Sequence, residues 1–306
     1  MRTRFAPSPT GPLHLGHAYA AILAHDMAKR SGGEFLIRIE DIDRSRARPE
    51  WEEMIFEDLA WLGLGWETPV LRQSERNHFY RQALHSLWQR DLLYPCDCTR
   101  RDIEQAATAP QEGAPTLTGP DGVVYPGTCR NKNWPDFDSR ARSRFPYPQH
   151  MTTRLTMASA VMSVCERHMI GPGQTRWIVG FNETGRGARG ESGWIEADRQ
   201  TLVEQIGDVV VARRDMATSY HLSVVVDDAA QGITHVTRGE DLFEATMIHV
   251  VLQRLLGLPT PTYHHHRLIR DAEGKRLAKR DDARALRKYR AEGATPADIR
   301  RLLGLD

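Results

Sequence analysis

The chain has 306 residues and a formal net charge of +1 at neutral pH; 40% of its residues are hydrophobic and 26% are charged. These values are typical of a globular protein with room for about two domains. No apolar run reaches the ~18 residues that a membrane-spanning helix needs, and no signal peptide is recognisable, so we expect a cytoplasmic protein with no membrane partner. The four cysteines are few for a disulfide scaffold.

The first elements are a short strand over residues 2–6, a turn rich in proline and glycine, and a helix over residues 13–29 with Thr10 as a candidate cap. The N–H groups and dipole at such a helix start favour phosphate. His14 and His17 are three residues apart and share a helix face, where imidazoles can donate to phosphate oxygens. An isolated pair would more simply be two surface histidines, but the surrounding prolines and glycines favour an anion site.

A second strand is expected over residues 34–40 and should run parallel to the first, because strand, helix and strand follow one another. Glu40 and Asp41 then lie at the carboxyl end of the sheet, where ligands of open parallel sheets bind. A carboxylate there can hold a substrate ammonium, although Asp41 and Asp43 can also cap the next helix. Helices are expected over residues 49–64 and 74–93, the second capped by Ser74.

Three cysteines form an incomplete metal site in the poorly periodic stretch 95–150. Cys96, Cys98 and Cys129 provide three of the four ligands that structural zinc takes, and His150 or Cys165 could be the fourth by residue type.

The second half of the chain is expected to alternate strands with one helix. Residues 170–193 are rich in glycine and suggest an irregular surface insertion. The remaining expected elements are buried strands at 220–226 and 233–236, a helix at 241–256 and a strand at 262–268. The last strand carries three consecutive histidines, which favour core or pocket-wall packing over metal binding, because alternate residues face opposite sides.

Two basic features of this half suggest anion binding. Arg238 can pair bidentately with a carboxylate, or else form a helix-capping ion pair with Glu240 or Asp241. The loop at 271–280 contains glycine and several cations, and a mobile lysine there can neutralise a pyrophosphate leaving group. Asp227 and Asp228 could also suggest a magnesium site, although the family resemblance that follows implies a structural role.

The segment RFAPSPTGPLHLGH (residues 4–17) resembles the HIGH-motif segment of class I aminoacyl-tRNA synthetases, in the form of the glutamyl/glutaminyl branch. Residues 73–76 and 207–242 resemble further segments of that branch, and residues 276–280 resemble its KMSKS loop. The loop departs from the family at Arg276, which replaces a lysine, and at Ala278, which replaces the serine.

The resemblance implies an α/β fold, a class I Rossmann-like parallel sheet with an inserted zinc-binding subdomain. The expected divisions are residues 1–94 and 151–240 for the two catalytic halves, 95–150 for the insertion, and 241–306 for a short C-terminal helical region. The chain leaves no room for the anticodon-binding domain of a full glutamyl-tRNA synthetase.

The resemblance also implies ATP-dependent activation of L-glutamate, with Mg²⁺ accompanying ATP, and transfer of the glutamyl group to RNA. The residues matching the family's glutamate contacts are Arg4, Phe5, Ala6, Pro7, Ser8, Glu40, Tyr220 and Arg238. Those matching its ATP-binding and catalytic positions are His14, Gly16, His17 and Lys279. The KMSKS-like loop consists of Arg276, Leu277, Ala278, Lys279 and Arg280.

The cysteine pattern narrows the resemblance to the shorter paralogues of glutamyl-tRNA synthetase that glutamylate queuosine in tRNA(Asp). Their unusual zinc ligands match Cys96, Cys98, Tyr125 and Cys129. We therefore expect one structural zinc ion, a monomer, and the anticodon stem-loop of tRNA(Asp) as partner. Two alternatives stay open: a truncated glutamyl-tRNA synthetase that charges a tRNA 3′ end, and a non-catalytic paralogue that binds RNA or an adenylate.

Overall fold

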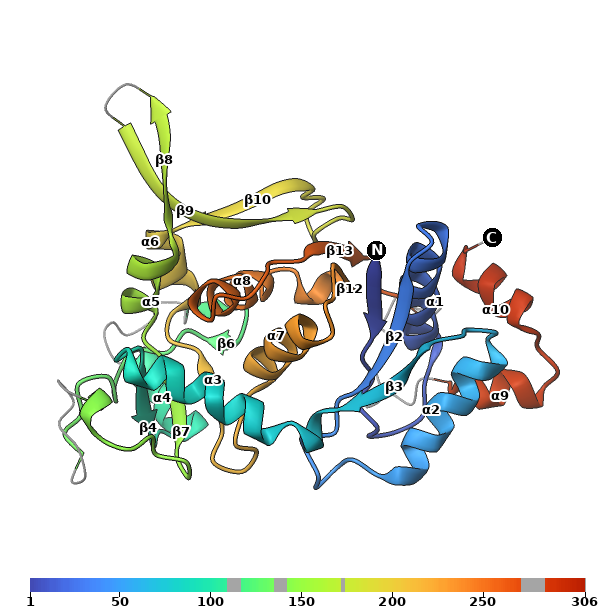
Figure 1. Cartoon of the computed structure of the whole chain (residues 1–306), viewed down its shortest axis with the longest axis horizontal. Coiled ribbons are helices and arrows are strands. Elements are labelled where there is room, and N and C mark those ends of the chain that lie inside the picture. Colours follow the sequence, from blue (N-terminus) through green and yellow to red (C-terminus); the bar gives the residue numbers. More distant parts are fainter. Residues whose placement is uncertain (109–116, 135–141, 172–173, 271–283, 306) are drawn as a thin grey trace.

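The computed structural model describes residues 1–108, 117–134, 142–171, 174–270 and 284–305 (Figure 1). At the right of Figure 1, strands of the N-terminal segment are gathered with helices from both ends of the chain. In chain order these are β1 (Arg2–Phe5), α1 (Leu15–Arg30), β2 (Glu34–Ile39), α2 (Pro49–Trp61), β3 (Glu67–Arg72), α9 (Leu286–Ala291) and α10 (Pro296–Leu303). The N-terminal and C-terminal segments of the chain therefore share one hydrophobic core.

The three strands form a parallel sheet in the order β1-β2-β3, with Arg2 opposite Glu34 in the first pair. The predicted parallel relation of the first two strands is therefore confirmed. On the other side of β1 lies β12 (His235–Gly239), since the Thr234 N–H donates to the Arg2 carbonyl at 3.0 Å. β12 pairs in parallel with β13 (Thr262–His266). This arrangement brings the carboxyl ends of β1, β2, β12 and β13 to the same side of the paired strands.

The stretch 170–193 is irregular over residues 184–192, as the sequence suggested, but Gln174–Glu183 is a strand of a β-ribbon (Figure 1). β8 (Glu166–Gly171) and β10 (Gly193–Asp198) both pair antiparallel with β9 (Gln174–Glu183), which also pairs in parallel with β13. Gly180 fits within β9 because the neighbouring strand leaves no room for a side chain; a Cβ there would be 2.3 Å from the Ile195 carbonyl oxygen and 2.7 Å from the Trp194 ring. Glycine that makes room for a neighbour was misread as a sign of irregular backbone.

The segment predicted as a buried strand at 220–226 is a helix, α7 (Tyr220–Ala230). Ser219 caps it by accepting a hydrogen bond from the Leu222 N–H. The error has a physical reason: a short apolar run rich in valine looks the same in a buried helix and a buried strand, and tertiary packing overrides the β preference of valine. Its buried side chains include Leu222, Val224 and Val225.

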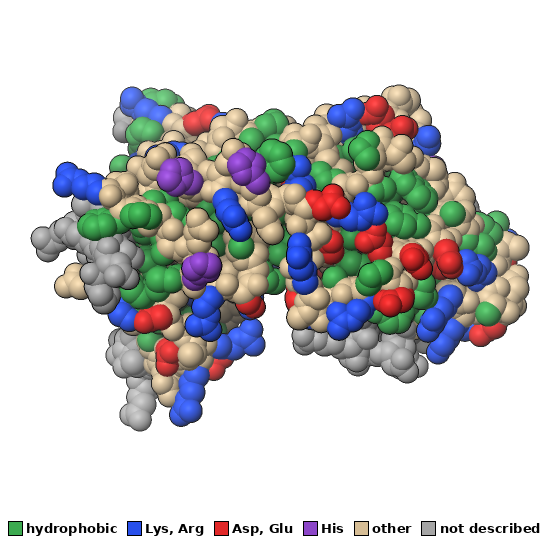
Figure 2. All heavy atoms as spheres, turned by 60° about the horizontal axis from the view of Figure 1, so that its bottom comes forward, with side chains coloured by type: hydrophobic (Ala, Val, Ile, Leu, Met, Phe, Trp, Pro, Cys, Tyr) green, Lys and Arg blue, Asp and Glu red, His purple; other side chains and the backbone are tan. Residues whose placement is uncertain are grey.

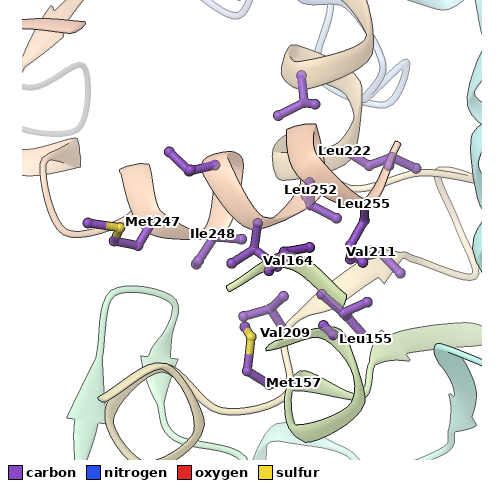
Figure 3. Close-up of a cluster of buried hydrophobic side chains, with 14 of the residues drawn as sticks. Leu155, Met157, Val164, Val209, Val211, Leu222, Met247, Ile248, Leu252 and Leu255 are labelled. Carbon is purple, nitrogen blue, oxygen red and sulfur yellow. The ribbon is translucent and has the colours of Figure 1, made fainter. Parts of the chain in front are cut away.

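α7 packs beside α8 (Thr246–Leu255) over the largest hydrophobic core (Figure 3). The side chains labelled in Figure 3 come from these two helices and from α5 (Met157–Val164), β7 (Thr152–Leu155) and the stretch 209–212 that contains β11 (Val210–Ala212). Full burial of one such aliphatic side chain contributes roughly 1.5–3 kcal/mol. This core holds α7 rigidly and so positions Tyr220 at its first residue.

Further elements lie at the left and lower middle of Figure 1, and one of them, β4, ends at Cys96. They are α3 (Asn77–Gln89), β4 (Leu93–Cys96), α4 (Arg100–Thr108), β5 (Thr118–Gly119) and β6 (Gly122–Val123). Ser74 does not cap α3 as predicted; its hydroxyl and N–H both donate to Asp41, and Arg76 stands at the cap position. Within the described ranges, no helix is both long and apolar enough to cross a bilayer.

Candidate functional site

A cavity of about 390 Å³ opens at the carboxyl ends of the parallel strands. Its walls come from the turns after β1, β2, β12 and β13 and from the starts of α1 and α7. The predicted site residues that line it are Arg4, Phe5, Ala6, His14, Gly16, His17, Glu40, Tyr220 and Arg238. Pro7 and Ser8 are not among the described residues that line it, although the Pro7 carbonyl accepts from the Glu40 N–H at 3.0 Å.

The N-terminus of α1 forms one wall of this cavity. Its cap is His14 rather than Thr10, because the His14 Nδ1 accepts from the Gly16 N–H at 3.1 Å. In return, the His17 Nδ1 accepts from the His14 N–H at 3.2 Å. A neutral imidazole that accepts at Nδ1 carries its proton on Nε2. Both rings therefore present an Nε2–H donor, and their centroids are only 3.8 Å apart.

This geometry favours glycine at position 16. A Cβ at that position would be 3.0 Å from Cε1 of the His14 ring. That distance is tighter than most real Cβ contacts, so any larger residue would push the capping ring away.

A buried charge network underlies the cavity. The Asp228 carboxylate accepts from Arg4 Nε at 2.9 Å and from Arg38 Nη1 at 2.5 Å. Arg38 Nη2 also donates to Glu40 at 3.2 Å. Burial alone would raise the pKa of Asp228, but the charges of Arg38 and Arg4 outweigh it, so the pKa lies below its usual value. Asp228 is thus structural, as expected, and Arg38 is a network member that the sequence did not single out.

In Glu40, unlike Asp228, the effect of burial on the pKa outweighs that of the neighbouring charges. Burial raises its pKa above the usual value, despite the opposing effect of Arg38. Its side chain is 13% exposed and lines the cavity. A bound cation would favour the ionised form of such a carboxyl.

Arg238 is 7% exposed and donates to three neutral acceptors. Its Nε donates to His265 Nε2 at 3.1 Å, its Nη1 to His249 Nδ1 at 3.0 Å, and its Nη2 to Thr246 Oγ1 at 2.6 Å. The alternative of an ion pair with Glu240 or Asp241 is wrong within the described structure. His249 was missed by the sequence analysis, whereas His265 belongs to the three histidines that were expected to pack against a core or pocket.

Lys279 and the rest of the KMSKS-like loop, 276–280, lie outside the described residues. One described flank of that segment lines the cavity, and the other pairs with the segment that forms its wall. Ile269 lines it, and Ala285 forms a β-bridge with His14 while the Leu286 N–H donates to Leu13.

The three cysteines expected to bind metal come together in a compact group. The sulfurs of Cys96, Cys98 and Cys129 all lie within 4.8 Å of one another. The Tyr125 hydroxyl lies 3.5 Å from Cys96 and 3.4 Å from Cys98. Sulfurs that share a tetrahedral zinc ion at 2.3 Å would be about 3.8 Å apart, which fits this group. The cysteine cluster could therefore hold a metal ion.

Neither alternative fourth ligand belongs to this group in the described structure. Cys165 is buried in the largest core, and His150 lies on the wall of an adjoining groove. Burial raises the pKa of the Tyr125 phenol and that of the Cys129 thiol, the latter to about 12. Arg154 donates to Cys96 Sγ at 3.3 Å and lies 3.8 Å above the Tyr125 ring, so a cation adjoins the ligand set.

A larger groove of about 1090 Å³ adjoins the cavity and shares Tyr220 and Leu242 with it. It extends from Tyr220 past Arg213 and Arg214 to the cysteines. A third cavity of about 420 Å³ shares Arg214 with the groove and is also lined by Arg44 and Arg81. Figure 2 shows the surface hollowed between the two halves of the molecule, with Lys and Arg side chains on both sides of the hollow.

The profile of the family "tRNA synthetases class I (E and Q), catalytic domain" matches residues 1–128 and 193–305. The chain belongs to this family. It is 63% identical over 305 residues, the full length of both chains, to the glutamyl-Q tRNA(Asp) synthetase of Rhodobacter capsulatus. It is 40% identical to that of Symbiobacterium thermophilum, over 97% of this chain and 83% of the relative.

Solved structures agree with this assignment. The glutamate-tRNA synthetase of Elizabethkingia anophelis superposes with a TM-score of 0.66 and 29% identity over 92% of this chain. The match covers 53% of that synthetase, so this chain spans about half of its length. The predicted α/β fold with a parallel catalytic sheet is confirmed.

Proposed function

We propose that the protein activates L-glutamate with ATP and transfers the glutamyl group to the queuosine base at the wobble position of tRNA(Asp). The observation that carries this proposal is the convergence of His14, His17, Glu40, Tyr220 and Arg238 on one cavity, in a family member that is 63% identical to a glutamyl-Q tRNA(Asp) synthetase. Each side chain has chemistry suited to one part of the bound reactants.

Glutamate recognition needs one anionic and two cationic contacts. Arg238 suits the side-chain carboxylate because its guanidinium has no carboxylate partner in the described structure. Glu40 suits the ammonium group, and Arg4, which also lines the cavity, is the second cation available to the carboxylates of glutamate. Tyr220 covers the opening, being 40% exposed at the junction with the larger groove.

Activation follows when the α-carboxylate of glutamate attacks the α-phosphate of ATP and displaces pyrophosphate. The Nε2–H groups of His14 and His17 would donate to the phosphate oxygens as charge develops, and the dipole at the N-terminus of α1 would favour the same negative charge. Lys279 would neutralise the departing pyrophosphate. Mg²⁺ bound with ATP would supply further positive charge. The protein's part is positioning and electrostatics, with no covalent enzyme intermediate.

Transfer requires that an RNA hydroxyl reach the glutamyl-adenylate. The larger groove supports this step, because it begins at the Tyr220 wall of the cavity and carries the exposed Arg213 and Arg214. Such cations contact phosphates of RNA. We further propose zinc as the ion of the cysteine site, with Cys96, Cys98, Tyr125 and Cys129 as its ligands. There it would stabilise the inserted segment beside the groove.

The test locates the glutamyl group. The protein is incubated with labelled glutamate, ATP and either tRNA(Glu) or queuosine-containing tRNA(Asp), and each RNA is then cut with ribonuclease. Label in the anticodon-loop fragment of tRNA(Asp), absent from tRNA(Asp) without queuosine, is the expected result. Label on the 3′-terminal adenosine of tRNA(Glu) would instead identify a compact glutamyl-tRNA synthetase. Failure of glutamate-dependent exchange of pyrophosphate into ATP would indicate a non-catalytic paralogue.

A further inference from the structure

The guanidinium of Arg238 differs from the other two buried guanidinium groups of the site in what it binds. Arg4 and Arg38 are both paired with the Asp228 carboxylate. Arg238 donates instead to two imidazoles and a hydroxyl. A carboxylate partner would cancel most of its charge, whereas neutral acceptors hold it in place and leave the charge for a ligand.

The hydrogen bonds around Arg238 determine which nitrogen of each imidazole carries the proton. Arginine only donates, so His249 Nδ1 and His265 Nε2 must both accept. The His265 proton is then on Nδ1, which donates to Glu183 at 2.5 Å. The His249 proton is on Nε2, which donates to His221 Nδ1 at 3.1 Å.

The hydrogen bonds continue one step further from the cavity. Because His221 accepts at Nδ1, its proton is on Nε2, which donates to Asp121 at 3.3 Å. The result is one continuous series of hydrogen bonds, in the order Asp121, His221, His249, Arg238, His265 and Glu183. Asp121 lies between β5 and β6, so the series joins the inserted segment to the cavity wall.

Burial keeps the two imidazoles beside Arg238 neutral. His249 is 2% exposed and His265 is 1% exposed. Burial and the charge of Arg238 hold the pKa of His249 well below its usual value. Of the five N–H groups of the Arg238 guanidinium, three are used in these bonds, which leaves one on Nη1 and one on Nη2. Two such groups can bind a carboxylate bidentately.

We propose that His249, held in one tautomer by His221 and Asp121, is a positioning residue that presents the uncompensated charge of Arg238 to the carboxylate of the amino-acid substrate. Asp121 thereby makes the affinity for glutamate depend on the inserted segment. The inference rests on the proposed function, since it assigns Arg238 to a substrate carboxylate.

Two variants of His249 separate the two bonds that its ring makes. In His249→Asn, the side-chain oxygen lies near the position of Nδ1 and can still accept from Arg238, while the bond to His221 is lost. In His249→Gln, the longer side chain reaches the position of Nε2 and loses the acceptor beside Arg238. His235→Asn is the matched control, because His235 lies on the same strand as Arg238 and contacts Thr234 instead.

The measurement is glutamate-dependent exchange of pyrophosphate into ATP, with KM determined separately for glutamate and for ATP. We expect His249→Gln to raise the KM for glutamate about tenfold, His249→Asn about threefold or less, and Asp121→Ala two- to fourfold. The KM for ATP should stay within about twofold of wild type in all three, and His235→Asn should match wild type throughout.

Three outcomes would decide against the inference. Equal KM values for glutamate in the Gln and Asn variants would show that the acceptor beside Arg238 is not what matters. Parallel rises in both KM values would show a general structural defect. Absence of exchange in the wild-type protein would overturn the proposed function itself, which distinguishes that failure from a failure of the positioning role.

Discussion

Replacing Asp228 by asparagine tests the buried charge network most directly. Asp228 is 6% exposed and is the carboxylate partner of both Arg4 and Arg38, whose side chains are 7% and 0% exposed. The change keeps the size of the side chain but removes its charge. Arg4 is left without a carboxylate partner, and Arg38 keeps only Glu40.

Removing one member of a buried ion pair costs about 3–5 kcal/mol, because the partner's charge stays buried without compensation. Asparagine can still accept a hydrogen bond, so we expect the lower end, about 3 kcal/mol. For a chain of this size, 1 kcal/mol corresponds to roughly 2–4 °C in Tm, so the expected decrease is about 6–12 °C. The control is Glu196→Gln, which removes an exposed pair with Arg176 and should change stability by less than about 0.5 kcal/mol.

Thermal unfolding followed by circular dichroism measures this difference at pH 7 and in acid. Since the pKa of Asp228 is lower in the folded chain than in the unfolded one, its stabilisation is present above about pH 4 and is lost as the pH falls below that value. The wild-type advantage should therefore shrink towards pH 3. A Tm within about 2 °C of wild type at pH 7, or a difference that persists in acid, would refute the reasoning.

Three further predictions concern the histidines, the cysteines and the phosphate site. Burial lowers the pKa values of His249, His265 and His266, so the unfolded chain binds protons that the folded chain does not, and Tm should fall as the pH decreases from 7.5 to 5.5; a constant Tm would contradict this. Elemental analysis should find about one zinc per chain, and Cys129→Ser or chelation should remove it and lower Tm. His17→Ala should lower kcat of pyrophosphate exchange about 10²-fold with little change in the KM for glutamate. A comparable rise in that KM would instead point to disrupted folding.

Much of the fold and the candidate site could be predicted because the signals lie close together in the sequence. Proline, glycine and two histidines within residues 7–17 specify a strand-to-helix turn, and the second strand follows within one helix. The four candidate metal ligands span residues 96–129. Short separations of this kind leave a characteristic pattern of residues, which can be recognised without knowing the tertiary contacts.

Other features depend on contacts between distant segments. The helix α7 was misread as a strand because burial on several sides removes the amphipathic pattern that distinguishes the two. The ribbon of β8, β9 and β10 was misread because Gly180 makes room for the Ile195 carbonyl and the Trp194 ring of the neighbouring strand. In both cases the local preference of the chain is weaker than the packing that surrounds it.

Arg238 shows most clearly what a residue type indicates by itself and what only tertiary contacts decide. Its residue type alone indicates carboxylate binding, since a guanidinium is planar, permanently charged and bidentate. Whether that charge is neutralised by the protein or left for a substrate depends on side chains at positions 246, 249 and 265, and on the groups at 121, 183 and 221 behind them. No spacing rule connects these positions, because hydrogen bonds between elements arise only when the packed core brings the elements together.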